Sequence, residues 1–229
     1  MNASQRTRPY TGMREPAADR PVASSYPTVL SRMYAQVRLA ILSPALREQV
    51  FCELPSQGVL LDIGCGYGLM GCLLGLSHPS LRYVGVDLNP RRIAIARQAA
   101  ERLRIPCAEF HCADARAVLP EERFDAILLM DMLHHVNHAA KRNLLRTCQS
   151  RLRPGGVLVI KDISSRPWAK MAFTWLLDVV VSRGFEMWYW STDEFLAELQ
   201  QAGFEVKAQS VPDRLPYPHV VFRCRPKQA

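Results

Sequence analysis

The fold is decided by the stretch Val59-Leu60-Leu61-Asp62-Ile63-Gly64-Cys65-Gly66-Tyr67-Gly68. Its first half, apolar apart from Asp62, predicts a short buried strand. The three alternating glycines that follow allow a tight turn and a close approach of a ligand to the backbone. Residues 69–76 then predict a helix. A buried strand, a glycine turn and a helix are typical of a sheet that binds its ligand beyond the carboxyl ends of the strands.

The rest of the chain continues this alternation of strands and helices. Further strands are predicted at residues 83–87, 107–112, 124–130 and 157–161, and helices at residues 90–103, 139–152 and 192–202. Pro154-Gly155-Gly156 predicts a turn before the strand at residues 157–161, and Ser191 to Glu194 predict a capping box at the start of the last helix. A proline-rich connection separates two last strands, residues 204–210 and 219–224, and suits an antiparallel hairpin. We therefore predict an α/β fold with a doubly wound, mostly parallel seven-stranded sheet and a C-terminal antiparallel hairpin.

Two segments precede the first strand. Residues 1–27 contain four prolines and little hydrophobic periodicity, and we predict that they form a disordered tail. Residues 28–54 have apolar residues at helical spacing, interrupted by Ser43-Pro44, and predict an N-terminal helical cap of two helices. The tail is thus followed by one domain, residues 28–229.

An apolar segment, residues 164–190, is inserted after the fifth strand. Its residues 168–181 are apolar on every side of a helix, so another surface must cover them. The cover could be the N-terminal helical cap, a second subunit, or a lipidic or aromatic substrate. Trp175 and the run Met187-Trp188-Tyr189-Trp190 add aromatic surface. We expect the insert and the cap to form the pocket for a hydrophobic acceptor together.

Length and composition restrict the class of protein. The chain has 229 residues, 48% hydrophobic and 22% charged, which suffices for one globular domain with a core. It has no apolar run of the length of a membrane span and no secretory signal, so a cytoplasmic protein is expected. Seven cysteines in apolar segments argue against disulfides, and no metal is expected from their spacing. The net charge of +8 suits nucleic acid, an anionic membrane surface or simply a basic enzyme.

The glycine turn also matches a dinucleotide fingerprint. Gly66-x-Gly68-x-x-Gly71 is followed by Asp87 at a suitable distance. These glycines begin late, however, because the first glycine of a dinucleotide fold directly follows the strand. Asp62 at the strand end also favours a ligand with an ammonium group over a pyrophosphate. A nicotinamide-dependent oxidoreductase therefore remains an alternative.

Several segments resemble the successive signatures of class I methyltransferases that depend on S-adenosylmethionine (SAM). They are residues 59–68, 84–90, 112–115, 124–136 and 152–160, in the order and spacing of that family. The resemblance covers about residues 55–210 and is specific as a set. It implies a Rossmann-like fold, SAM as the cofactor and methyl transfer as the activity.

The resemblance also implies a cofactor site at the strand ends. The implied residues are Asp62, Gly64, Cys65, Gly66, Asp87, Leu88, Asp114, Ala115, Met130 and Asp131. Asp62, Gly64 and Gly66 would hold the methionine part of SAM. Asp87 would bind the ribose hydroxyls, and Leu88 would pack on the adenine. Asp114, with Ala115 beside it, would accept from the adenine amino group, and Met130 and Asp131 would end the fourth strand beneath the sulfonium. Each of these residues taken singly also has a purely structural explanation. The acids could cap the ends of strands, and the glycines could simply form turns.

Two histidines after the fourth strand are candidate catalytic residues. His134 and His135 can accept a proton near neutral pH, which a hydroxyl acceptor requires. His134 stands where plant O-methyltransferases of the catechol and phenol type place their catalytic histidine, so we rank it ahead of His135. Both could instead line the SAM pocket. Lys161-Asp162 face the same site by topology, and the acid there could steer a cationic acceptor or neutralise Lys161.

The sequence thus predicts an enzyme that transfers a methyl group from SAM to an oxygen or carbon atom of a hydrophobic small molecule. An RNA methyltransferase is an alternative, but the fourth strand lacks the Asn/Asp-Pro-Pro-Tyr/Phe loop that holds a base, so nucleic acid is not expected as a partner. A SAM-binding, non-catalytic partner subunit is another. Peripheral membrane contact and the choice between monomer and homodimer stay open.

Overall fold

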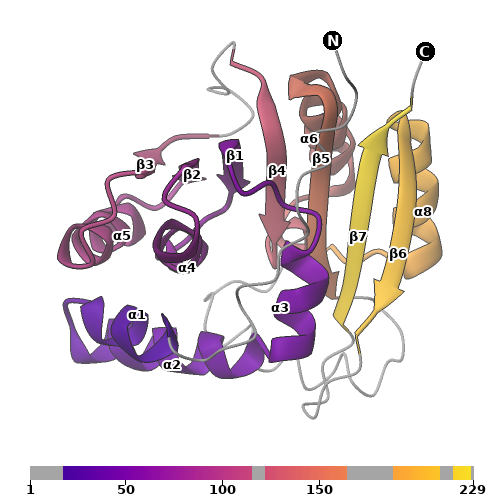
Figure 1. Cartoon of the computed structure of the whole chain (residues 1–229). Coiled ribbons are helices and arrows are strands. Elements are labelled where there is room, and N and C mark those ends of the chain that lie inside the picture. Colours follow the sequence, from indigo (N-terminus) through magenta and orange to yellow (C-terminus); the bar gives the residue numbers. More distant parts are fainter. Residues whose placement is uncertain (1–17, 115–121, 164–187, 212–218, 228–229) are drawn as a thin grey trace, which may run out of the picture.

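A central sheet with helices on both faces forms the core of the computed structural model, which describes residues 18–114, 122–163, 188–211 and 219–227 (Figure 1). The strands are β1 (Gly58–Ile63), β2 (Leu81–Asp87), β3 (Ala108–Cys112), β4 (Phe124–Met130), β5 (Leu152–Ile163), β6 (Phe204–Ser210) and β7 (His219–Pro226). The helices are α1 (Asp19–Ser25), α2 (Val29–Ile41), α3 (Pro44–Phe51), α4 (Leu69–Ser77), α5 (Pro90–Arg102), α6 (His138–Arg151) and α8 (Thr192–Gln201). A short 3₁₀-helix, η2 (Leu133–His135), follows β4.

The sheet has the strand order β3-β2-β1-β4-β5-β7-β6. β1 pairs in parallel with β2 on one side and with β4 on the other, so the winding reverses at the carboxyl end of β1. β7 runs antiparallel to both β5 and β6. The predicted fold class is therefore confirmed, and the glycine turn after β1 lies at the reversal point, where sheets of this kind bind ligands.

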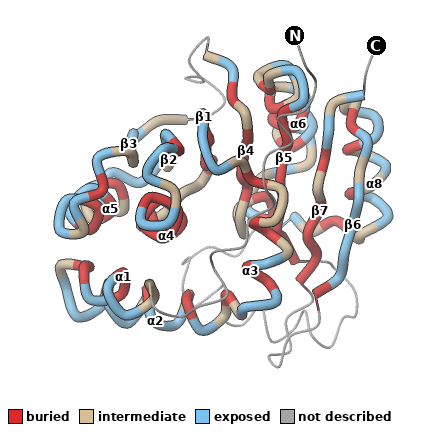
Figure 2. The backbone as a smooth tube through the Cα atoms, viewed as in Figure 1, coloured by how far each residue is buried: buried red, intermediate tan, exposed pale blue. Residues whose placement is uncertain are grey.

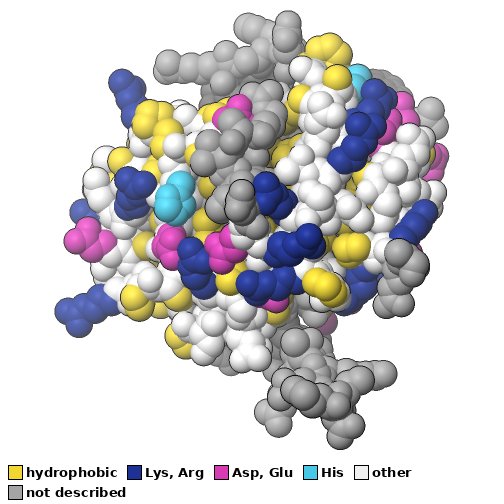
Figure 3. Space-filling view, turned by 90° about the horizontal axis from the view of Figure 1, so that it is seen from above, with side chains coloured by type: hydrophobic (Ala, Val, Ile, Leu, Met, Phe, Trp, Pro, Cys, Tyr) yellow, Lys and Arg dark blue, Asp and Glu magenta, His cyan; other side chains and the backbone are white. Residues whose placement is uncertain are grey.

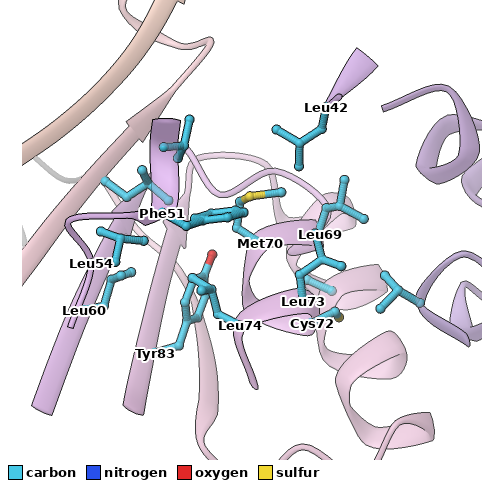
Figure 4. Packing of buried hydrophobic residues seen from close by; sticks show 14 of the residues in the cluster. Leu42, Phe51, Leu54, Leu60, Leu69, Met70, Cys72, Leu73, Leu74 and Tyr83 are labelled. Carbon is cyan, nitrogen blue, oxygen red and sulfur yellow. The ribbon is translucent and has the colours of Figure 1, made fainter. Parts of the chain in front are cut away.

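Two apolar layers hold the helices to the sheet. One layer contains residues of α1 to α5, and the other contains residues of α6 and α8. The buried parts of the chain are accordingly the strands and the inner sides of the helices (Figure 2). Figure 4 shows Phe51, the last residue of α3, beside Met70 on α4, and Leu54, which follows this helix, beside Leu60 on β1. This packing fixes the N-terminal helical cap against the sheet.

The break in the N-terminal helical cap lies where the sequence predicts it. Ser43 precedes α3 and its side chain accepts a hydrogen bond from the backbone N–H of Leu46, with Pro44 as the first helical residue. The faces of α2 are less readily predicted. Ser31, Ala35 and Leu39 face inward, whereas the large apolar side chains are exposed: Val29, Leu30, Met33 and Val37. Apolar spacing thus predicts this helix but not its buried face.

The predicted disordered tail is wrong for its last residues. Residues 19–25 form α1, in which Val22 is fully buried, and Tyr26 behind it is fully buried as well. Arg47 on α3 donates two hydrogen bonds of 2.6 Å to the carboxylate of Asp19. These contacts are tertiary, so the local composition of proline-rich residues could not reveal them. The earlier part of the predicted tail lies outside the described residues.

Two further features concern the ends of the sheet. The predicted turn Pro154-Gly155-Gly156 is part of β5, which begins at Leu152 and changes register opposite β4. The predicted capping box of α8 is present, with Ser191 and Glu194 bonding to each other's backbone N–H groups.

Among the helices that the structure describes, none combines the length and the hydropathy that a membrane span requires.

Candidate active site

The glycine turn after β1 is tied to the end of β2. The backbone N–H groups of Gly64 and Cys65 both donate to the carbonyl of Val86, at 2.8 and 3.0 Å. Gly66 and Gly68 have positive φ angles of 56° and 74°, which favour glycine. A Cβ atom on Gly68 would lie 2.6 Å from the ring of Phe110, whereas one on Gly66 would meet no atom within 4 Å. Gly66 therefore borders open space, where a ligand can reach the backbone.

Asp87 joins this turn to the start of α5. Its Oδ2 accepts a hydrogen bond of 3.0 Å from the N–H of Gly66, and its Oδ1 accepts one of 2.8 Å from the N–H of Asn89. Leu88, the next residue, is 66% exposed. The structure thus brings Asp87 and Gly66 together, as the prediction requires, and places an exposed apolar side chain beside the carboxylate.

Asp114, another acid predicted for the cofactor site, follows β3 at the same edge of the sheet as Asp87. Asp87 pairs with Cys112 across β2 and β3, so Asp114 lies just beyond the carboxyl end of the neighbouring strand and is partly exposed. Ala115, the other residue predicted here, lies outside the described residues. The strand ends of β1, β2 and β3 therefore meet at one edge of the sheet.

Asp62 lies beneath the glycine turn and is only 2% exposed. The hydroxyl of Tyr83 donates a hydrogen bond to its Oδ2. Burial raises the pKa of Asp62 to about 7, although the bond from Tyr83 opposes this and the charge of Asp87 adds to it. Asp62 was predicted to hold the methionine part of SAM, and in the structure its side chain contacts Tyr83 on β2.

Two cations meet the carboxylate of Asp131 at the end of β4. Lys161 on β5 donates to Oδ1, and the guanidinium of Arg38 on α2 donates to Oδ2 at 2.7 Å. Burial alone would raise the pKa of Asp131, but the charges of Lys161 and Arg38 outweigh it and hold this pKa well below its usual range. We call Arg38, Asp131 and Lys161 the charged cluster.

A pocket adjoins the charged cluster. It is a small cleft that is partly open to solvent. Its lining combines the charged cluster with apolar side chains, which are Ile41, Leu42, Leu46, Leu69, Met70 and Met130. Figure 1 shows α3 beside the carboxyl ends of β4 and β5, so the N-terminal helical cap forms one wall. Met130 and Asp131, both predicted for the cofactor, thus border this pocket.

The two histidines of η2 differ in their surroundings. His134 is 3% exposed, and its Nδ1 lies 2.7 Å from Oδ1 of the buried Asp162. His135 is exposed, although partial burial of its ring and the neighbouring His134 lower the pKa of His135 to about 4. The two rings are 4.1 Å apart. Of the two predicted candidates, His134 is buried and His135 is exposed.

Lys161 and Asp162 have separate partners because successive strand residues point to opposite faces. Lys161 contacts Asp131 on the side of the pocket, and Asp162 contacts His134 on the other side. The sequence left open whether Asp162 neutralises Lys161. In the structure, the carboxylate that pairs with Lys161 is that of Asp131. Alternation along β5 was a signal that could have predicted it.

Of the apolar segment at residues 164–190, the structure describes only the last three residues, Trp188 to Trp190. The backbone N–H of Trp188 donates to the carbonyl of His134, and Trp190 packs against His138 and Phe195 on the α6 and α8 side. The buried Lys141 donates to the carbonyl of Trp188 and lies 4.5 Å from the centre of the Trp190 ring. The predicted pocket surface at residues 164–187, which includes Trp175, lies outside the described residues.

Comparison with known proteins assigns the chain to a family. Residues 33–209, more than half of the chain, match the family model described as a methyltransferase domain. The chain belongs to the methyltransferase-domain family. The resemblance of its motifs to class I SAM-dependent methyltransferases is thereby confirmed.

Two curated relatives of this methyltransferase-domain protein carry the name ubiquinone biosynthesis O-methyltransferase. The one from Rhodopseudomonas palustris (strain HaA2) is 28% identical over 144 residues, 62% of this chain and 54% of the relative. The one from Cereibacter sphaeroides (strain ATCC 17025) is 37% identical over 119 residues, 50% of this chain and 45% of the relative. The chain thus spans about half the length of these relatives.

A solved structure shares the fold of the methyltransferase domain over nearly its whole length. It is magnesium protoporphyrin IX methyltransferase from Synechocystis PCC 6803 with bound SAH, with a TM-score of 0.64 and 16% identity. The match covers 91% of this chain and 92% of that one. At this identity the likeness establishes the fold alone.

Proposed function

We propose that the chain is a SAM-dependent methyltransferase that methylates an oxygen or carbon atom of a hydrophobic small molecule. One observation carries this proposal: the glycine turn, Asp87 and Met130 lie at the carboxyl edge of adjacent strands, next to an apolar pocket. A methyl donor at this edge would have its reactive end near Met130 and an acceptor in the pocket.

The residues at the strand ends fit SAM. Gly66 borders open space, so the cofactor can approach the turn without meeting a side chain. Each oxygen of Asp87 accepts one backbone hydrogen bond, which fixes the carboxylate and leaves lone pairs for the two hydroxyls of a ribose. The exposed side chain of Leu88 offers an apolar surface to the adenine. The implied cofactor site is therefore consistent with the chemistry of its donors and acceptors.

The chain itself contributes alignment and the exclusion of water. SAM, when bound, supplies a methyl group on a sulfonium leaving group. The apolar walls of the pocket desolvate the acceptor, and the N-terminal helical cap restricts its orientation. The protein needs a base only where the acceptor is protonated, as in a hydroxyl.

For a hydroxyl acceptor, we assign the proton to His135. Its ring is exposed and its lowered pKa keeps it neutral, and therefore able to accept a proton, throughout the physiological range. His134 contacts Asp162 below and His135 above, so we assign it a positioning role. This reverses the order that the sequence suggested, because burial separates the two histidines.

The names of the curated relatives support oxygen as the methylated atom and a quinone-like acceptor. The charge of the chain gives less support to RNA. Several arginines are paired with acids: Arg82 with Glu109 and Glu122, Arg142 with Glu198, and Arg225 with Glu53. On the face seen in Figure 3, acidic side chains likewise lie between several of the Lys and Arg side chains. A salt-sensitive gel shift with RNA would reverse this preference.

Calorimetry with S-adenosylhomocysteine (SAH), the product form of the cofactor, tests the proposed function. Asp87→Ala should weaken SAH binding by roughly 1–3 kcal/mol, the range for lost hydrogen bonds to a charged group. The control is Glu109→Gln on the outer strand β3, which should leave SAH affinity unchanged. Binding of NAD(H) in place of SAH would favour an oxidoreductase. Binding of SAH without transfer of labelled methyl from SAM into a cell extract would favour a non-catalytic partner subunit.

A further inference from the structure

The charged cluster is unusual because it lies inside an otherwise apolar pocket. Lys161 has a side-chain exposure of 2%, Asp131 of 12% and Arg38 of 30%. Ion pairs withdrawn from water lose much of their solvation and stabilise a fold weakly compared with apolar packing. Their presence in a pocket wall is therefore more readily explained by recognition of a ligand than by folding stability alone.

Three separate elements converge to build the cluster. Arg38 comes from α2, Asp131 follows β4 and Lys161 lies near the end of β5. Asp131 has a φ of 50°, a left-handed conformation that costs a non-glycine residue of the order of 1–3 kcal/mol. The strained backbone turns the carboxylate toward both cations, so their positions relative to the pocket are fixed.

Among the residues that the structure describes, the charged side chains of the lining are two cations and one carboxylate. The guanidinium of Arg38 and the ammonium of Lys161 share the single carboxylate of Asp131, so the charged cluster carries one net positive charge. His219 lies close enough to Arg38, Asp131 and Lys161 for their charges to affect its pKa. Burial and the charge of Lys161 lower this pKa to about 3, so His219 adds no positive charge. The lining therefore favours a ligand that is apolar for most of its length and carries a negative charge at one end.

We propose that Arg38 and Lys161 bind a carboxylate of the acceptor, so that this methyltransferase acts on hydrophobic acids in preference to their neutral analogues. The inference rests on the proposed function and narrows its substrate class. Asp131 acts as the counter-charge that holds the two cations in position, and the apolar wall formed by Ile41, Leu46 and Met70 contacts the rest of the acceptor. Arg38 and Lys161 are then specificity-determining residues.

The carboxylate of the cofactor is the other anion that this chemistry could bind. The glycine turn and Asp87 lie on the β2 side of β1, whereas the charged cluster lies on the β4 and β5 side, beneath α2. The strands β1 and β4 separate Asp87 on β2 from Lys161 on β5, which favours the acceptor as the source of the anion. Leu69 and Met70, which directly follow the glycine turn, line the same pocket as the charged cluster, so the experiment measures both ligands.

Calorimetry on the SAH-saturated protein compares two acids with their amides. The pairs are 3,4-dihydroxybenzoate with 3,4-dihydroxybenzamide, and octanoate with octanamide. At least one acid should bind about 10- to 100-fold more tightly than its amide, the range for hydrogen bonds to charged groups. Arg38→Gln should remove most of this preference without a change in SAH affinity, and Arg38→Lys, which keeps the charge, should retain part of it.

Each other outcome overturns the inference. A wild-type protein that prefers neither acid to its amide has no acid-binding cluster. A loss of SAH affinity in Arg38→Gln, with acid binding retained, would assign the anion to the cofactor. Lys161→Met should also abolish the preference, and circular dichroism shows whether this variant still folds; Arg38→Gln, which keeps the Lys161–Asp131 pair, gives the result independently. A wild-type protein that does not bind SAH contradicts the proposed function itself, which is a separate failure.

Discussion

The two halves of the candidate site are built in different ways. On the cofactor side, the turn after β1 and the end of β2 place backbone groups around an open space, and Asp87 joins them. On the acceptor side, charged side chains from α2, β4 and β5 meet in one pocket. The first half depends on residues close in sequence, and the second depends on residues brought together only by folding.

Because of this difference, substitutions in the two halves should have different effects on folding stability and on ligand binding. Backbone geometry tolerates many side chains but few losses of glycine, whereas a buried charged cluster tolerates no unpaired member. Substitutions on the acceptor side should therefore affect folding stability most, and substitutions on the cofactor side should affect binding most.

Asp131→Ala should have the largest effect. It leaves the buried Lys161 without its carboxylate, and removal of one partner from a buried ion pair costs about 3–5 kcal/mol of unfolding free energy. Urea denaturation measures this loss. Arg82→Ala, which breaks an exposed pair, is the control and should cost no more than about 1 kcal/mol. Equal losses in the two variants would show that the acceptor side is no more dependent on charge than the surface is.

Asp62 should make stability fall as the pH rises. Its folded-state pKa is about 7 and its ordinary value is 3.8, so between these pH values the folded chain binds more protons than the unfolded one. The unfolding free energy then decreases with rising pH, by up to about 1.4 kcal/mol per pH unit from this group. Asp62→Asn should flatten the curve measured by urea denaturation between pH 5 and 7. An unchanged slope would mean that Asp62 stays ionised beneath the turn.

Gly66 and Gly68 separate binding from folding within one turn. Gly68→Ala places a methyl group against Phe110 and Ala96 and should lower the unfolding free energy by about 1–3 kcal/mol. Gly66→Ala meets no neighbouring atom, so its stability loss should stay near 1 kcal/mol, the cost of a left-handed residue. Its methyl group occupies the space that we assign to the cofactor, and SAH affinity should fall. Thermal melts should show the larger stability loss for Gly68→Ala, and calorimetry should show the larger loss of SAH affinity for Gly66→Ala. The opposite ranking in either measurement would contradict the prediction.

The smallest expected effect concerns the pH profile of a reaction in which His135 accepts the proton. Its pKa of about 4 means that the ring stays neutral when the pH falls below 6.5. The kcat/KM for a hydroxyl acceptor should therefore not decline between pH 7 and 5 through protonation of this histidine. A decline centred near pH 6.5 that His135→Gln removes would show that the ring is more solvated than its position indicates.

Sequence patterns predicted the local parts of this molecule well. The strand and turn at residues 59–68 and the caps at Ser43 and Ser191 each depend on neighbouring residues, so a short stretch contains the whole signal. The same holds for Asp87, whose position follows from the length of one strand–helix–strand unit.

Contacts between distant residues were not predicted. Arg38 and Asp131 are 93 positions apart, and neither stands in a motif that refers to the other. The helix α1 was missed because its stability comes from burial of Val22 against other helices. The difference in burial between His134 and His135 was not predicted either, because adjacent residues in a short 3₁₀-helix can differ completely in burial.

The N-terminal segment touches both halves of the site. The hydroxyl of Tyr26 donates a hydrogen bond of 3.0 Å to the carbonyl of Tyr67 in the glycine turn, and Tyr34 on α2 packs on the ring of Tyr67 at 4.5 Å. The same helix carries Arg38 into the pocket. A displacement of α2 would thus disturb both proposed ligand sites at once, which makes this helix a mechanical link between them.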